Sequence, residues 1–143
     1  MRALLLATVV LLSACAPSAG PAPSAGGTPA ASASPAEQVV QVQLEAYNRR
    51  DLEGFLATYS PEIRIYLHPD RLLMSGLDQM RKEYGDAFTA NPDGRAAITS
   101  RMVQGNYVID HEHVTGQADG REIRAVAIYE VRDGKIRNVW FIG

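Results

Sequence analysis

The chain has 143 residues, of which 46% are hydrophobic, and its 14 Lys and Arg and 16 Asp and Glu residues give a formal net charge of −2. This balance, without a basic patch, excludes a nucleic-acid-binding footprint and attachment to anionic lipid by charge alone. The chain contains one cysteine, and its length suits a single modest core.

The first fifteen residues have the layout of an export signal. Arg2 precedes a ten-residue apolar run, Ala3–Leu12, which is too short to span a bilayer. Leu12-Ser13-Ala14-Cys15 follows and resembles the lipobox of bacterial lipoproteins. The resemblance implies that residues 1–14 are a signal peptide and that Cys15 is acylated at the start of the mature chain. The alternative is an ordinary secretory signal with a cysteine beside the cleavage point.

Residues 15–34 continue as the lipidated cysteine and a tether. Ala16–Ser34 is rich in Ala, Ser, Gly and Pro and carries no charge and no large apolar side chain. Such a segment cannot bury enough surface to fold, and a random coil of this length spans roughly 25 Å. The lipoprotein resemblance implies an exported protein, lipid-anchored in a bacterial cell envelope. Because Ala16 and not Asp follows the cysteine, it implies the outer membrane in a host that has two.

Residues 35–143 form the expected domain, which opens with helices. Ser34, Pro35 and Glu37 make a capping box for a helix up to Asn48. Asp51 caps a short second helix whose apolar stripe runs to Tyr59, and Ser60-Pro61 ends it. Ile63, Ile65 and Leu67 alternate with polar residues in a strand that ends at Pro69. A third helix runs from about Ser75 to Asn91.

The rest of the chain predicts strands. Four segments rich in Val, Ile, Tyr and Thr are separated by turn residues, the last by the hairpin signal Asp133-Gly134. They cover 95–104, 106–116, 121–132 and 135–142. Helices followed by antiparallel strands indicate an α+β fold with one curved, mostly antiparallel sheet and helices on one face.

Three motifs carry a family resemblance. Tyr47–Leu52, Arg101–Glu112 and Tyr129–Ile136, in this order of elements, resemble the SnoaL-like branch of the nuclear transport factor 2-like superfamily. The resemblance covers residues 36–143 and implies an α+β cone around an apolar pocket, with pairing into a homodimer through the outer sheet face. Members include proton-transfer enzymes and proteins without catalytic activity. The steroid isomerase residues would fall on Gln43, His68 and Ala127, so that catalytic pattern is not retained.

A pair of carboxylates is the candidate site. Asp110 and Glu112 share one strand face with Val108 and Val114, and family parity turns this face into the cone. The expected partners, and the remaining members of the ligand site, are Arg101, His68, Tyr66 and Tyr129. With His68 as base or acid, the carboxylates could move a proton near neutral pH. The alternative is a satisfied ion-pair network without catalysis.

Two choices of strand face stay open. If Asp110 and Glu112 face solvent, then His111 and His113 point inward. Family parity places the side chains of Tyr66 and His68 inside the cone, whereas simple alternation with Ile63, Ile65 and Leu67 places them outside. We follow the family and expect both inside the cone.

The sequence favours no cofactor. His111 and His113 offer only two metal ligands, so we expect no metal site. No glycine-rich phosphate loop or nucleophile elbow is present.

Three functions therefore compete. The first is a membrane-tethered module whose cone binds a small, largely apolar molecule or an envelope protein. The second is a cofactor-free isomerase, dehydratase or cyclase that uses His68 with Asp110 and Glu112. The third is a structural dimer whose cone is filled by its own side chains, and the size of the pocket discriminates it from the other two.

Overall fold

The helical half of the fold starts at the predicted caps. The computed structural model describes residues 32–143, so the predicted signal peptide, Cys15 and most of the tether lie outside the described residues. α1 spans Pro35–Arg49 and α2 spans Leu52–Leu56. Ser34 Oγ accepts a hydrogen bond from the Glu37 N–H at 3.1 Å, and Asp51 Oδ1 accepts one from the Gly54 N–H at 2.9 Å. Both predicted N-caps are therefore confirmed.

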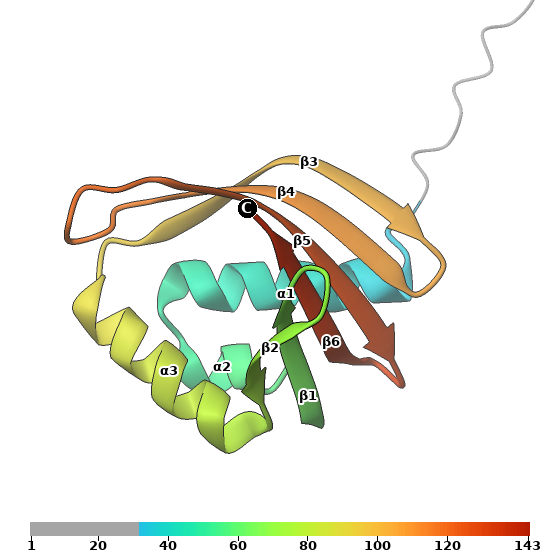
Figure 1. The fold of residues 1–143 in the computed structure, drawn as a ribbon. Coiled ribbons are helices and arrows are strands. Elements are labelled where there is room, and N and C mark those ends of the chain that lie inside the picture. Colours follow the sequence, from blue (N-terminus) through green and yellow to red (C-terminus); the bar gives the residue numbers. More distant parts are fainter. Residues whose placement is uncertain (1–31) are drawn as a thin grey trace, which may run out of the picture. The chain divides into compact units, whose positions relative to one another are not determined.

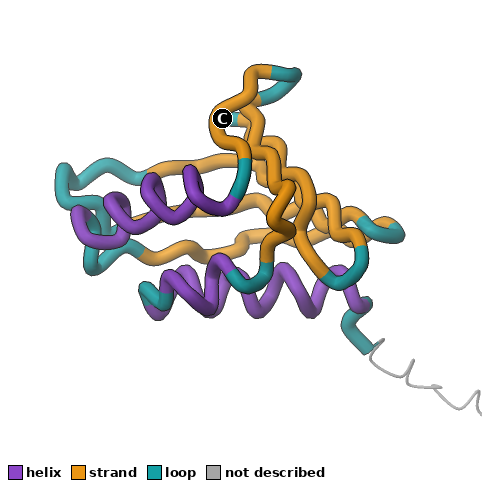
Figure 2. Tube along the Cα trace, turned by 90° about the horizontal axis from the view of Figure 1, so that it is seen from below, coloured by secondary structure: helices purple, strands orange, loops and turns teal. Residues whose placement is uncertain are grey.

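One curved six-stranded sheet wraps the helices (Figure 1). Its strand order is β2-β1-β6-β5-β4-β3, and every pairing is antiparallel except the parallel pair of β1 and β6. In the view from below, the helices (purple) run alongside the strands of the sheet (orange) (Figure 2). The fold is thus the expected α+β arrangement. The remaining elements are β1 (Tyr59–Leu67), β2 (Arg71–Ser75), α3 (Leu77–Ala90), β3 (Arg95–Gln104), β4 (Tyr107–Thr115), β5 (Ile123–Arg132) and β6 (Lys135–Ile142).

The helix–strand boundary before β1 and the presence of β2 differ from the sequence prediction. α2 ends at Leu56, and Tyr59 belongs to β1 instead of the helical stripe. Pro61 lies inside β1, where the pairing with β6 shifts register between Tyr59 and Arg64, so its missing N–H breaks no ladder hydrogen bond. β2 was not predicted, because Leu72 and Leu73 are exposed and the strand shows no alternation.

The core lies between α1, α2, α3 and the concave sheet face. Phe55 is fully buried and contacts the rings of Tyr47, Tyr59, Tyr84 and Phe88 at centroid distances of 4.6 to 6.0 Å. These tilted and edge-on arrangements are those that aromatic quadrupoles favour. The tyrosines of this cluster also reach the site described below.

The end of α1 is fastened to the start of β3. Asn48 Nδ2 donates to the Ala96 carbonyl at 2.9 Å, and Asn48 Oδ1 accepts from the Ala96 N–H at 2.8 Å. The side chain thereby pairs with the strand as a neighbouring backbone would. Arg50, in the left-handed region at φ 58°, lays its guanidinium 4.5 Å from the centre of the Tyr47 ring.

Each strand turns one face toward the helices. On β4, Val108, Asp110, Glu112 and Val114 face inward, as the parity argument expected. On β1, Ile63 and Ile65 are buried, whereas Tyr66 stacks on Trp140 with ring centroids 5.8 Å apart. No helix of the described residues is long and apolar enough to cross a membrane.

Candidate functional site

A cavity of about 420 Å³ opens between the helices and the concave face of the sheet. Its walls are mostly aliphatic and aromatic, with few polar groups, as in binding sites for small organic molecules. The sheet contributes Glu112 and Val114 from β4 and Tyr129 from β5, while α1 contributes Gln43 and Tyr47. The other lining residues are Leu44, Tyr59, Leu67, Leu73, Tyr84, Ala96, Ile123, Arg124, Ala125, Phe141 and Gly143.

Glu112 and Tyr129 form the polar centre of this cavity. The two residues lie on the neighbouring strands β4 and β5, and both project from the concave face. The Tyr129 hydroxyl donates a hydrogen bond to Glu112 Oε1 at 2.7 Å. Among the described residues, Glu112 has no other side-chain hydrogen bond and no ion-pair partner. One carboxylate oxygen is therefore available to a ligand.

Burial gives Glu112 an unusual proton affinity. Loss of hydration raises the pKa of its carboxyl to about 7, although the hydrogen bond from Tyr129 acts in the opposite direction. The negative charge of Asp110 raises this pKa further and the positive charge of Arg101 lowers it. A carboxyl with this pKa exists in both protonation states near neutral pH, so it can accept or donate a proton there.

Tyrosine hydroxyls line the rest of the polar surface. Gln43 Nε2 donates to the Tyr59 hydroxyl at 3.0 Å, which fixes both side chains against the helix layer. Burial raises the pKa of Tyr59, of Tyr84 and of Tyr129 above the ordinary tyrosine value. The three phenols consequently stay protonated at neutral pH and serve as hydrogen-bonding groups, not as bases.

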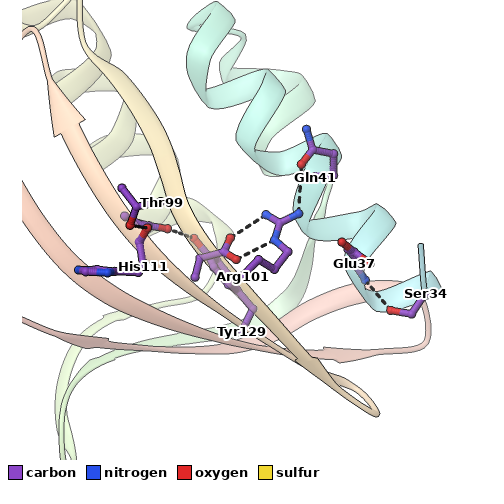
Figure 3. Close-up of polar contacts among 9 residues, drawn as sticks. Ser34, Glu37, Gln41, Thr99, Arg101, His111 and Tyr129 are labelled. Carbon is purple, nitrogen blue, oxygen red and sulfur yellow. Dashed lines mark hydrogen bonds and ion pairs between the residues drawn. The ribbon is translucent and has the colours of Figure 1, made fainter. Parts of the chain in front are cut away.

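Asp110 belongs to a separate, closed network. Arg101 Nε and Nη2 each donate to one Asp110 oxygen at 2.7 Å, and Arg101 Nη1 donates to Gln41 Oε1 of α1 at 3.1 Å. Figure 3 shows Arg101 reaching from the sheet toward Gln41. Asp110 is 1% exposed, so this bidentate pair balances a buried charge. Its geometry ties β3 and β4 to α1 beside the cavity.

The structure brings only part of the predicted site together. Glu112, Val114 and Tyr129 line the cavity, Val108 is fully buried beneath it, and Arg101 and Asp110 pair beside it.

Tyr66 and His68 lie elsewhere, which corrects their expected position inside the cone. Tyr66 packs on Trp140 on the outer face, and His68 is exposed next to a cis bond to Pro69. The apolar side chains Ile63, Ile65 and Leu67 occupy the inner face of β1, and alternation sends Tyr66 and His68 away from it. His68 is not among the residues that line the cavity, so it is not placed to act with Glu112.

Several lining residues were missed as site residues. In the sequence, Tyr47, Tyr59 and Tyr84 fall at helical spacing with apolar residues, which indicates core positions, and Gln43 stands out only as a replaced isomerase position. The usable signal is chemical: a tyrosine or glutamine on a buried stripe needs a hydrogen-bond partner, which a cavity or a second polar residue supplies.

The histidines of β4 point to the convex face. His113 Nε2 lies 2.7 Å from Glu122 Oε2, and His111 is exposed. Among residues 32–143, no group of three or more His, Cys, Asp or Glu side chains is arranged to hold a metal ion.

Comparison with protein families identifies one match. The profile described as a SnoaL-like domain matches residues 40–139. The comparison with curated proteins gives no match.

Solved structures with the same fold are numerous. An uncharacterised cystatin-fold protein from Novosphingobium aromaticivorans is similar with a TM-score of 0.70 and 24% identity, over 77% of this chain and 98% of that one. AclR from Streptomyces galilaeus, a proposed hydroxylase, has a TM-score of 0.63 and 25% identity over 74% and 76% of the two chains. A proposed SnoaL-like polyketide cyclase from Jannaschia sp. CCS1 has a TM-score of 0.62 and 16% identity, over 75% and 83%.

Proposed function

The chain belongs to the SnoaL-like domain family, and on that premise we propose that its cone binds a small, largely apolar molecule bearing one polar group. The observation that carries the proposal is the cavity of about 420 Å³ with Glu112 and Tyr129 at its centre. Apolar walls supply binding free energy by burying ligand surface, and a single polar pair orients the ligand. A cone filled by its own side chains would leave no such space.

Adjacent alanines of β3 provide a test of this function. Ala96 lines the cavity, whereas Ala97 is exposed on the opposite face. We expect Ala96→Phe to fill the cavity and abolish co-purification of a small molecule, measured by mass spectrometry of material extracted from the natively purified protein. Ala97→Phe is the matched control and should retain the molecule. A native protein that carries no small molecule, and that gains no thermal stability from any member of an apolar compound library, would refute the proposal.

A second candidate is a cofactor-free proton-transfer enzyme of the isomerase, dehydratase or cyclase type. The observation that favours it is the pKa of Glu112, which at about 7 suits a general base. Tyr129 would orient the Glu112 carboxylate through its hydrogen bond, and Glu112 takes the part that the sequence hypothesis shared among His68, Asp110 and Glu112. A bell-shaped dependence of turnover on pH, lost in Glu112→Gln, would separate catalysis from simple binding.

We also propose that the domain forms a homodimer through the convex sheet face. Large apolar side chains remain uncovered there in the described residues, including Met102 at 61% and Ile142 at 42% exposure. The stacked Tyr66 and Trp140 lie on the same face. Pairing two such faces would remove this surface from water.

Attachment to the cell envelope rests on the sequence. The pattern Leu12-Ser13-Ala14-Cys15 supports acylation of Cys15, export and anchoring in a bacterial membrane, the outer one where there are two. Two or more acyl chains give stable anchoring. We expect Cys15→Ser to release the protein from the membrane fraction or to leave an unprocessed precursor. A variant that is processed normally and still sediments with membranes would contradict the anchor.

A further inference from the structure

The cavity contains one buried charge of its own. Of the residues that line it, only Glu112 and Arg124 have a charged side chain. Arg124 lies at the mouth with a side chain that is 64% exposed, and its Nη2 is 3.9 Å from Glu122 Oε2. The Arg124 guanidinium is therefore solvated and already lies near an acid, so Glu112 determines the charge inside the cavity.

The cation whose charge acts on Glu112 is fully engaged elsewhere. Arg101 directs two nitrogens at Asp110 and the third at Gln41. Turning it toward Glu112 would leave the almost completely buried Asp110 carboxylate without a counter-charge, which is strongly unfavourable. Glu112 is thus a carboxylate without a counter-charge, and Tyr129 supplies its one hydrogen bond among the described residues.

Aromatic rings surround this carboxylate. Tyr47, Tyr59, Tyr84, Tyr129 and Phe141 all contribute to the cavity walls. Ring faces carry partial negative charge and attract cations, most strongly where water is excluded. Aromatic walls around an unpaired acid form a surface complementary to a cation and not to an anion.

We infer that the ligand of this cavity is an amphiphilic amine, whose protonated nitrogen pairs with Glu112 among the tyrosine rings while its apolar body fills the cone. This inference rests on the proposed binding function and specifies its ligand class. An ammonium group of the ligand would supply the counter-charge that Glu112 does not receive from the described residues of the protein. A ligand carboxylate would instead meet like charge.

Three probes that share one apolar body test this inference. 1-Naphthylmethylamine, 1-naphthalenemethanol and 1-naphthoic acid carry a cationic, a neutral and an anionic polar group, respectively, on the same naphthalene ring. We would titrate each into the purified protein by isothermal calorimetry at pH 8. We expect the amine to bind about tenfold more tightly than the alcohol or better, because it adds one charge pair that is partly shielded from water. We expect the acid to bind most weakly.

Two further measurements isolate Glu112. In Glu112→Gln the preference for the amine over the alcohol should vanish. In the native protein the preference should shrink between pH 8 and pH 5.5, because the amine stays charged while Glu112 takes up a proton. The other titratable groups that face Glu112 are the hydroxyls of Tyr59, Tyr84 and Tyr129, whose raised pKa keeps them protonated over this range, and the Arg101–Asp110 ion pair described above.

The outcomes separate this inference from the proposed function. Equal affinity for amine and alcohol, or tightest binding of the acid, would overturn the inference and leave the binding function standing. Failure of all three probes to bind would contradict both. The comparison of probes on the native protein does not depend on the folding of any variant.

Discussion

Glu112 should make the protein less stable as the pH rises through neutrality. The unfolded chain gives this carboxyl its ordinary pKa of 4.5, whereas the folded protein raises it to about 7. Between these values the folded state holds the proton more tightly, so stability falls as pH increases and levels off above the folded pKa. At about 1.4 kcal/mol for each tenfold change in proton affinity, the difference amounts to about 3 kcal/mol.

Glu112→Gln removes this titration while keeping the shape of the side chain. We expect the variant to gain about 3 kcal/mol relative to the native protein when the pH changes from 4.5 to 8. Urea unfolding, followed by circular dichroism at a series of pH values, measures the difference in unfolding free energy between the variant and the native protein. The contributions of the other titrating groups cancel in this difference.

Glu83→Gln is the matched control, because Glu83 is exposed on α3 and has no ion pair among the described residues. It should leave the pH dependence unchanged. If Glu112→Gln and the native protein give parallel stability curves over this range, the carboxyl is hydrated and the site is not the one described.

Three other perturbations address the elements around the site. Arg101→Met should cost about 3–5 kcal/mol of unfolding free energy, because it leaves the buried Asp110 without a counter-charge, and the double variant Arg101→Met with Asp110→Leu should recover much of this loss. Arg121→Met, which breaks an exposed pair with Asp119, is the control, and an equally small cost for Arg101→Met would show that Asp110 is solvated. Asn48→Ala should cost about 2 kcal/mol, because it removes two hydrogen bonds to Ala96, whereas the exposed Gln38→Ala should be nearly neutral in the same unfolding assay. Met102→Glu should convert the expected dimer to monomers in analytical ultracentrifugation, whereas Val42→Glu, a change at an exposed position of α1, should leave the dimer intact. A native protein that is monomeric at micromolar concentrations would contradict the dimer.

Local signals in the sequence were sufficient for most of the fold. The caps at Ser34 and Asp51 and the Asp133-Gly134 turn act through neighbours within a few residues, so they are legible without the tertiary structure. The inward face of β4 was also accessible, since Val108 and Val114 are buried and impose their parity on the acids between them.

The site depended on contacts that the sequence does not display. Tyr59 meets Gln43 across the core, and Tyr129 meets Glu112 across a strand pair, so neither hydrogen bond follows from spacing along the chain. The face of Tyr66 was decided by its own strand, where alternation held although the pairing with β2 shifts register between Ile65 and Tyr66. Family parity was the weaker guide there, because the buried Ile63 and Ile65 fix which face the alternating residues of β1 occupy.

The parallel pairing of β1 with β6 determines when the cavity can exist during folding. β3, β4, β5 and β6 form successive hairpins between neighbours in the chain, but Ile65 pairs with Val139, from the last strand. Closing so long a loop is entropically costly, so contacts of this kind form late. The helices and β1 therefore complete the cone only after the whole chain is available, and loosening the β1–β6 pairing should abolish ligand binding while the four-stranded meander persists.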